Sequence, residues 1–215
     1  IRRAAFMANI IVPDAAVAVP TGGRSSRMGF PKAELKDSAG RRFFEALAEQ
    51  LSFFPCRYLS MAIDQHYEYP GFIPLRDEYP GTGPLGAILT ALGHAEKDPL
   101  FVIACDMPAF TGEEAGRIFA DYRGEDALIP AVNGRWQPLA ALYSRRMIPV
   151  FRECLEKGDL RLRNAIMKSA YRLCEVPEER RFNYLNLNTP EEYQVSLGHF
   201  RDNAGLPEER EKPAV

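Results

Sequence analysis

The chain has 215 residues, enough for one α/β domain with a sizeable core. Its 46% hydrophobic and 26% charged residues exclude a disordered or fibrous protein. A formal net charge of −2 gives no broad attraction to nucleic acid or anionic membranes, so neither is expected as a partner.

The N-terminal stretch of residues 4–19 is apolar but is interrupted by Asn9, Pro13 and Asp14, which argues against a membrane span and a signal peptide. The four cysteines form no Cys-x-x-Cys pair and the three histidines are scattered, so no structural zinc site is expected. Isolated cysteines in a chain of this size suit a reducing compartment, and we expect a cytoplasmic protein.

Short apolar runs alternate with amphipathic segments almost to the end of the chain. Strands are expected at residues 15–19, 58–63, 72–75, 100–104, 127–132, 139–143, 171–176 and 184–187. Helices are expected at residues 41–51, 83–95, 111–122, 145–157 and 162–170, with a last helix beginning at Thr189.

This alternation predicts a single-domain, three-layer α/β/α sandwich with a Rossmann-like, mostly parallel sheet. We assign residues 15–200 to that domain, residues 1–14 to an N-terminal extension and residues 201–215 to a flexible tail. Ligands of such sheets bind beyond the carboxyl ends of the strands. Chemistry is therefore expected just after Val19, Leu75, Ala104, Tyr143 and Leu187.

The loop after the first predicted strand carries the strongest signal. Residues 22–32 contain three glycines, two serines, two arginines and a lysine. Glycine lets backbone N–H groups approach a ligand closely, and Arg27 and Lys32 add positive charge, which predicts a cradle for a polyphosphate. The spacing matches neither a Walker A loop nor the dinucleotide fingerprint.

Two aspartates follow other predicted strands. Asp106 lies at the end of a buried strand, where one carboxylate facing a triphosphate suits Mg²⁺. A turn or helix-cap role is the alternative for Asp106 taken alone, and the neighbouring glycine-rich loop favours the metal site. Asp77 precedes a turn rich in proline and glycine and is placed to meet a purine edge or a ribose. A purely structural turn is equally consistent with Asp77 taken alone.

Neutral amides mark a second part of the predicted site. Asn186 and Asn188 point to one face if residues 184–187 form a strand, and they suit phosphate, metal-bound water or a second substrate. Gln137, just before another strand, is placed to meet that second substrate. The alternative for the asparagines is a surface strand with a polar outer face.

A polyphosphate cradle, the cations Lys32 and Arg27, a metal-binding Asp106 and no evident covalent nucleophile favour direct nucleotidyl transfer. The acceptor would be a phosphate that attacks the α-phosphorus of a nucleoside triphosphate. An ionised phosphate needs no general base, and none is placed for that role.

Five motifs in this order resemble the molybdenum cofactor guanylyltransferases, the MobA-like branch of the nucleotidyltransferase fold seen in nucleotide-diphospho-sugar transferases. The resemblance runs from about residue 17 to about residue 197. The motifs occupy residues 22–32, 77–85, 105–108, 137–139 and 186–192.

The resemblance implies transfer of GMP from GTP to the phosphate of the molybdenum–molybdopterin cofactor, with Mg²⁺, forming the guanine dinucleotide cofactor and releasing pyrophosphate. It also implies exchange with cofactor-synthesis and delivery proteins. Asp106 would hold GTP and Mg²⁺, and Asn186 and Asn188 would lie toward the acceptor. The nucleotide-binding residues carried over are Pro20, Thr21, Gly22, Gly23, Lys32, Asp77 and Asp106.

Two departures bear on base selectivity. The family usually has Leu-Ala where this chain has Pro20-Thr21, and proline has no N–H to donate to a base. The family also often has an asparagine within the stretch that corresponds to residues 60–64, which here contains none. A cytidylyltransferase or sugar-phosphate nucleotidyltransferase of the same fold, and a non-catalytic nucleotide-binding module, therefore remain alternatives.

Overall fold

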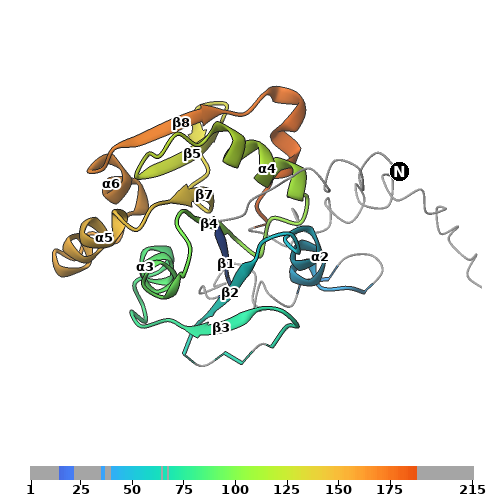
Figure 1. Cartoon of the computed structure of the whole chain (residues 1–215), viewed down its shortest axis with the longest axis horizontal. Helices are drawn as coiled ribbons and strands as arrows, with labels where there is room; N and C mark the ends of the chain where they lie inside the picture. Colours follow the sequence, from blue (N-terminus) through green and yellow to red (C-terminus); the bar gives the residue numbers. More distant parts are fainter. Residues whose placement is uncertain (1–14, 22–34, 37–39, 64, 67, 188–215) are drawn as a thin grey trace, which may run out of the picture.

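The computed structural model describes residues 15–21, 35–36, 40–63, 65–66 and 68–187. Within these residues eight strands form one sheet in the order β3-β2-β1-β4-β7-β5-β6, with β8 paired to β5 (Figure 1). The strands are β1 (Ala16–Pro20), β2 (Cys56–Met61), β3 (Ile73–Arg76), β4 (Leu100–Ile103), β5 (Ala127–Val132), β6 (Arg135–Trp136), β7 (Ala140–Tyr143) and β8 (Tyr171–Glu175).

Helices cover both faces of this sheet (Figure 1). One face carries α3 (Pro84–His94), α5 (Met147–Glu156) and α6 (Leu162–Met167); the other carries α2 (Phe43–Gln50), α4 (Gly112–Asp121) and the 3₁₀ helix η2 (Glu178–Tyr184). Side chains of β1 alternate between the two cores, with Val17 and Val19 packed toward α2 and Ala16 and Ala18 toward α3. The predicted three-layer sandwich is confirmed.

The sheet is mostly parallel, and only β6 and β7 run against the other strands. Tyr143, the last residue of β7, pairs with Leu100, the first residue of β4. The residues after Tyr143 therefore lie at the edge opposite the carboxyl ends of β1 to β4. The expectation that chemistry follows Tyr143 was wrong, because an apolar run indicates a strand but not its direction.

Other sequence predictions have mixed outcomes. Thr111 caps α4 as expected, accepting a hydrogen bond from the Glu114 N–H at 3.3 Å. The strand expected at residues 184–187 was wrong: Tyr184 ends η2, and residues 185–187 belong to no helix or strand. Strand β6 was missed.

Some predictions lie outside the described residues. These are the segments 1–14 and 201–215, the domain end at residue 200 and the helix expected from Thr189.

The cysteines at positions 56, 105, 154 and 174, all within the described ranges, are free thiols, and burial raises the pKa of Cys174 to about 11. None of the helices in the described ranges is both long enough and apolar enough to cross a membrane.

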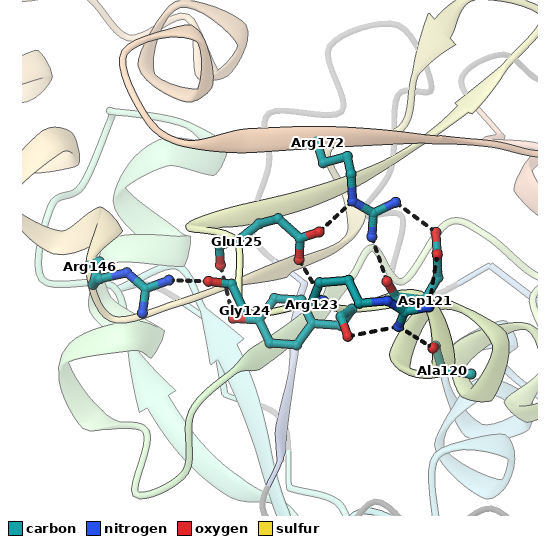
Figure 2. A network of polar contacts seen from close by, with 8 residues as sticks. Ala120, Asp121, Arg123, Gly124, Glu125, Arg146 and Arg172 are labelled. Atoms are coloured by element: carbon teal, nitrogen blue, oxygen red, sulfur yellow. Dashed lines mark hydrogen bonds and ion pairs between the residues drawn. The ribbon is translucent and has the colours of Figure 1, made fainter.

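An ion-pair network lies at the edge of the sheet opposite the carboxyl ends of β1 to β4. Arg172 of β8 lies between Glu125 and Asp121, and Arg146 reaches the Gly124 carbonyl (Figure 2). The Arg146 Nε also donates to Asp126 Oδ1 at 2.5 Å, and the Ala170 N–H donates to Asp126 Oδ2 at 3.0 Å. Asp126 thus joins the start of β5 to α5 and to the segment that enters β8.

This geometry predicts an acid-sensitive contribution to stability. Partial burial works to raise the pKa of Asp126, but the hydrogen bonds from Arg146 and Ala170 outweigh it and lower the pKa. A lowered folded-state pKa gives stabilisation that is present above about pH 4 and is lost as the pH falls through the folded pKa. Asp126→Asn should cost about 1–2 kcal/mol of unfolding free energy at pH 7.

The difference from wild type should shrink as the pH falls from 5 to 3, measured by urea unfolding at a series of pH values. An Asp126→Asn penalty that stays constant across this range would contradict the assignment.

Candidate active site

The carboxyl ends of β1, β2, β3 and β4 meet at one edge of the sheet, because these four strands are parallel neighbours. Strand β7 begins at the same edge, since Ala140 pairs with Ile103 at the end of β4. We call this edge the ligand rim: residues 20–21, 60–62, 76–77, 104–106, 137–139 and 186–187. It contains every predicted site residue that falls within the described residues.

Hydrogen bonds between backbones join the first half of the ligand rim. The Thr21 N–H donates to the Ser60 carbonyl at 2.8 Å, and the Thr21 hydroxyl donates to the same oxygen at 3.1 Å. The Asp77 N–H donates to the Met61 carbonyl at 2.9 Å. The segments after β1, β2 and β3 are therefore held side by side, with Thr21 buried and Pro20 at the last position of β1.

Two further backbone bonds join the second half. The Ala104 N–H donates to the Leu139 carbonyl at 2.8 Å, and the Leu187 N–H donates to the Asp106 carbonyl at 3.0 Å. Asp106 is buried, with 7% of its surface exposed, although it carries a carboxylate. The structure thus brings Asp106 together with the segments that hold Gln137 and Asn186.

Asp77 has a structural task in addition to any contact with a ligand. Its Oδ1 accepts hydrogen bonds from the Tyr79 N–H at 2.9 Å and from the Thr90 hydroxyl at 3.4 Å. These bonds tie the turn after β3 to α3.

The turn between Asp77 and α3 depends on close backbone packing. Gly83, at the N-cap of α3, has a φ of 66°, in the left-handed region that favours glycine. A Cβ built on Gly86 would lie 1.9 Å from the Thr82 Oγ1, 2.9 Å from the Tyr79 Cβ and 3.0 Å from the Tyr79 carbonyl oxygen. Only glycine at position 86 lets the turn pack this closely against the first turn of the helix.

Gln137 lies where β7 enters the sheet. Its N–H donates to the Pro130 carbonyl at 2.8 Å and its carbonyl accepts from the Ala140 N–H at 3.0 Å. The fully buried Tyr143 donates its hydroxyl to the Pro138 carbonyl at 2.7 Å, and burial raises the pKa of that hydroxyl. The backbone beside Gln137 is therefore fixed from within the core.

Several predicted site residues lie outside the described residues: Gly22, Gly23, Arg27, Lys32 and Asn188. Thr21 is the last described residue before the glycine-rich stretch, and it follows β1, which lies between β2 and β4. The chain is described again at Leu35, which is buried and accepts a hydrogen bond from the Phe43 N–H at 2.8 Å.

A family model described as the MobA-like NTP transferase domain matches residues 17–173. The chain belongs to this family. A probable molybdenum cofactor guanylyltransferase of Geobacillus sp. is 34% identical over 190 residues, covering 81% of this chain and 94% of that relative. The family predicted from the five motifs is therefore confirmed.

Solved structures agree on the fold. A molybdopterin-guanine dinucleotide biosynthesis protein A from Archaeoglobus fulgidus has a TM-score of 0.72 at 24% identity, covering 87% of this chain and 99% of its own. A nucleotidyl transferase from Methanothermobacter thermautotroptrophicus has a TM-score of 0.71 at 15% identity, covering 89% and 99%. At these identities the likeness establishes the architecture alone.

A polar cluster between α4 and η2 of this MobA-like domain was not predicted from the sequence. Glu114 of α4 is almost fully buried and accepts hydrogen bonds from Arg180, Asn183 and Tyr184. The sequence does hint at this cluster, because Glu114 is an acidic residue next to Ala115 on the apolar side of an amphipathic helix. Its partners lie about 70 residues away in the sequence, so no local pattern reveals them.

Proposed function

We propose that this chain transfers GMP from GTP to the phosphate of the molybdenum–molybdopterin cofactor, giving the guanine dinucleotide cofactor and pyrophosphate. The observation that carries the proposal is the ligand rim. Its backbone hydrogen bonds hold the ends of β1 to β4 and the entry of β7 together in a domain of the MobA-like family. The name of the Geobacillus relative supports the choice of substrates.

The order of the strands suggests how GTP would lie along the ligand rim. Asp77 follows β3, Thr21 follows β1 and Asp106 lies in the loop after β4. The ends of β3 and β4 are three strand spacings apart, about 14 Å at about 4.8 Å each. That span suits a nucleoside at the β3 end and phosphates near β1 and β4. Gly22, Gly23 and Lys32 would contact the phosphates, with Arg27 as a further cation.

The acceptor would approach from the β7 side, where Gln137, Asn186 and Asn188 are proposed to contact it. One of its phosphate oxygens would form a bond to the α-phosphorus of GTP. The bond from that phosphorus to the oxygen bridging to the β-phosphate would break, and pyrophosphate would leave. Lys32 and Arg27 would stabilise the negative charge on the phosphates. The remaining rate enhancement would come from the ligand rim, which would position the two substrates.

A magnesium ion fits the donor set. The described residues contain no group of three or more histidine, cysteine, aspartate or glutamate side chains that would hold a metal alone. Mg²⁺ commonly takes one or two carboxylates together with substrate phosphates and waters, and Asp106 is a buried carboxylate at the right place. When bound, the ion would neutralise charge on the triphosphate.

We also propose a cytoplasmic reaction, because the four cysteines are free thiols, and exchange of the acceptor with cofactor-synthesis and delivery proteins.

Pyrophosphate release in the presence of molybdenum–molybdopterin tests the proposal. We expect release with GTP and Mg²⁺, at least about tenfold slower release with CTP, and none with chelator in place of Mg²⁺. Preference for CTP would overturn the guanylyl assignment. The comparison of GTP with CTP is informative because Pro20 has no backbone N–H to donate to a base. Binding of GTP without any pyrophosphate release would favour a non-catalytic nucleotide-binding module.

A further inference from the structure

Glu114 is a charged residue in an apolar setting, and the proposed chemistry gives it no task. It lies in the first turn of α4 and has 2% of its surface exposed. Its Oε1 accepts from the Arg180 guanidinium and the Tyr184 hydroxyl, each at 2.9 Å, and its Oε2 accepts from the Asn183 amide at 3.4 Å. Burying a carboxylate is costly, and apolar packing often stabilises such a place better.

All three donors come from η2, which leads directly into the ligand rim. Tyr184 is the last residue of η2. Three residues later the Leu187 N–H donates to the Asp106 carbonyl at 3.0 Å. The segment 185–187, which contains Asn186, is therefore attached to α4 at one end and to Asp106, in the loop after β4, at the other.

The same cluster also contacts the loop that follows Asp106. The Tyr184 ring meets the Phe110 ring edge-on, with centroids 5.7 Å apart. The Phe110 N–H in turn donates to the Met107 carbonyl at 3.2 Å. Tyr184 thus contacts both Glu114 of α4 and Phe110 of the loop that follows Asp106.

We propose that Glu114 is a positioning residue: its carboxylate orients η2 and so sets where Asn186 lies relative to Asp106 on the acceptor side of the site. Hydrogen bonds are directional, so three of them fix the orientation of η2 on α4, which apolar contacts alone would not do. The positioning rests on the contacts above, and its consequence for the acceptor rests on the proposed function.

Glu114→Gln and Tyr184→Phe test the proposal. Glutamine keeps the size of the side chain but loses the charge paired with Arg180 and places an N–H₂ group among donors. Tyr184→Phe removes only the hydroxyl and keeps the ring beside Phe110, so it carries the test if Glu114→Gln does not fold. Glu113→Gln is the matched control, because Glu113 is an exposed neighbour paired with Arg117 of the same helix.

Two measurements are needed. The first is hydrogen exchange of the Leu187 amide by NMR, which requires no substrate. We expect exchange about tenfold faster in Glu114→Gln and Tyr184→Phe, and unchanged in Glu113→Gln. The second is steady-state kinetics, in which the KM for the acceptor should rise about tenfold while the KM for GTP stays within about twofold.

The outcomes separate this inference from the proposed function. A wild-type protein that transfers no GMP overturns the proposed function and, with it, the acceptor role of Glu114. An active wild type whose Glu114→Gln and Tyr184→Phe variants keep a normal acceptor KM overturns the role of Glu114 toward the acceptor. An equal rise of both KM values would likewise overturn it, because it would mark a general structural defect. Unchanged exchange of the Leu187 amide in both variants overturns the positioning itself, whether or not the protein is active.

Discussion

Replacing Asp106 with asparagine should lower kcat for pyrophosphate release by at least about 10²–10³, with GTP, Mg²⁺ and acceptor supplied. The substitution removes the negative charge that would hold the metal while keeping almost the same shape. Asparagine also keeps the backbone carbonyl of residue 106, which accepts from the Leu187 N–H. Because the size of the side chain and this hydrogen bond are retained, the melting temperature should change little.

The control for this prediction is Glu113→Gln, which removes one negative charge from an exposed pair and should leave kcat unchanged. Circular dichroism and thermal unfolding of both variants establish that they are folded. An Asp106→Asn enzyme that retains more than about a tenth of wild-type kcat would remove Asp106 from the proposed metal site.

Replacing Gly86 with alanine should destabilise the protein by about 1–3 kcal/mol and weaken GTP binding at the same time. The added methyl would meet the Thr82 side chain, which can rotate, but also the Tyr79 Cβ and carbonyl, which cannot move without shifting the turn. That turn is tied to Asp77 through the Tyr79 N–H. Urea unfolding and calorimetric titration with GTP measure the two effects.

Gly93 offers the same substitution in the same helix with the opposite expectation. A Cβ at Gly93 meets nothing within 4 Å, and alanine is a better helix former by about 1 kcal/mol. Gly93→Ala should therefore stabilise the protein slightly and leave GTP binding unchanged. If both variants behaved alike, steric contact at the start of α3 would not be the cause.

Much of the fold was predictable because burial imposes simple patterns. β1 and β4 are short apolar runs covered on both faces, and α4 has a threonine cap followed by two glutamates. The direction of β7 was not predictable, because residues 140–143 are apolar whichever way the strand runs. Residues 184–187 are mostly apolar, like a short strand, but Tyr184 ends η2 and residues 185–187 belong to no helix or strand, which only tertiary contacts decide.

The candidate site also has a part that was predictable from the sequence and a part that was not. Thr21, Asp77 and Asp106 were placed at one edge from the rule that parallel strands end together, and the structure puts them there. Gln137 reached the same edge for a different reason, namely that β7 begins there instead of ending there. The support from Tyr143 and Glu114 was not visible in the sequence, since each depends on a partner brought close only by folding.

The reversal of β7 has a consequence for how this protein can diverge. The half of the ligand rim that we propose binds the nucleotide follows β1 to β4. Gln137 instead follows a tight hairpin between β5 and β6, in which Asn133 and Gly134 have φ values of 50° and 73°. Insertions at that hairpin tip would lengthen an exposed finger without disturbing the register of the parallel strands. If Gln137 contacts the acceptor as proposed, acceptor preference can change through such insertions while the nucleotide contacts proposed after β1 to β4 stay the same.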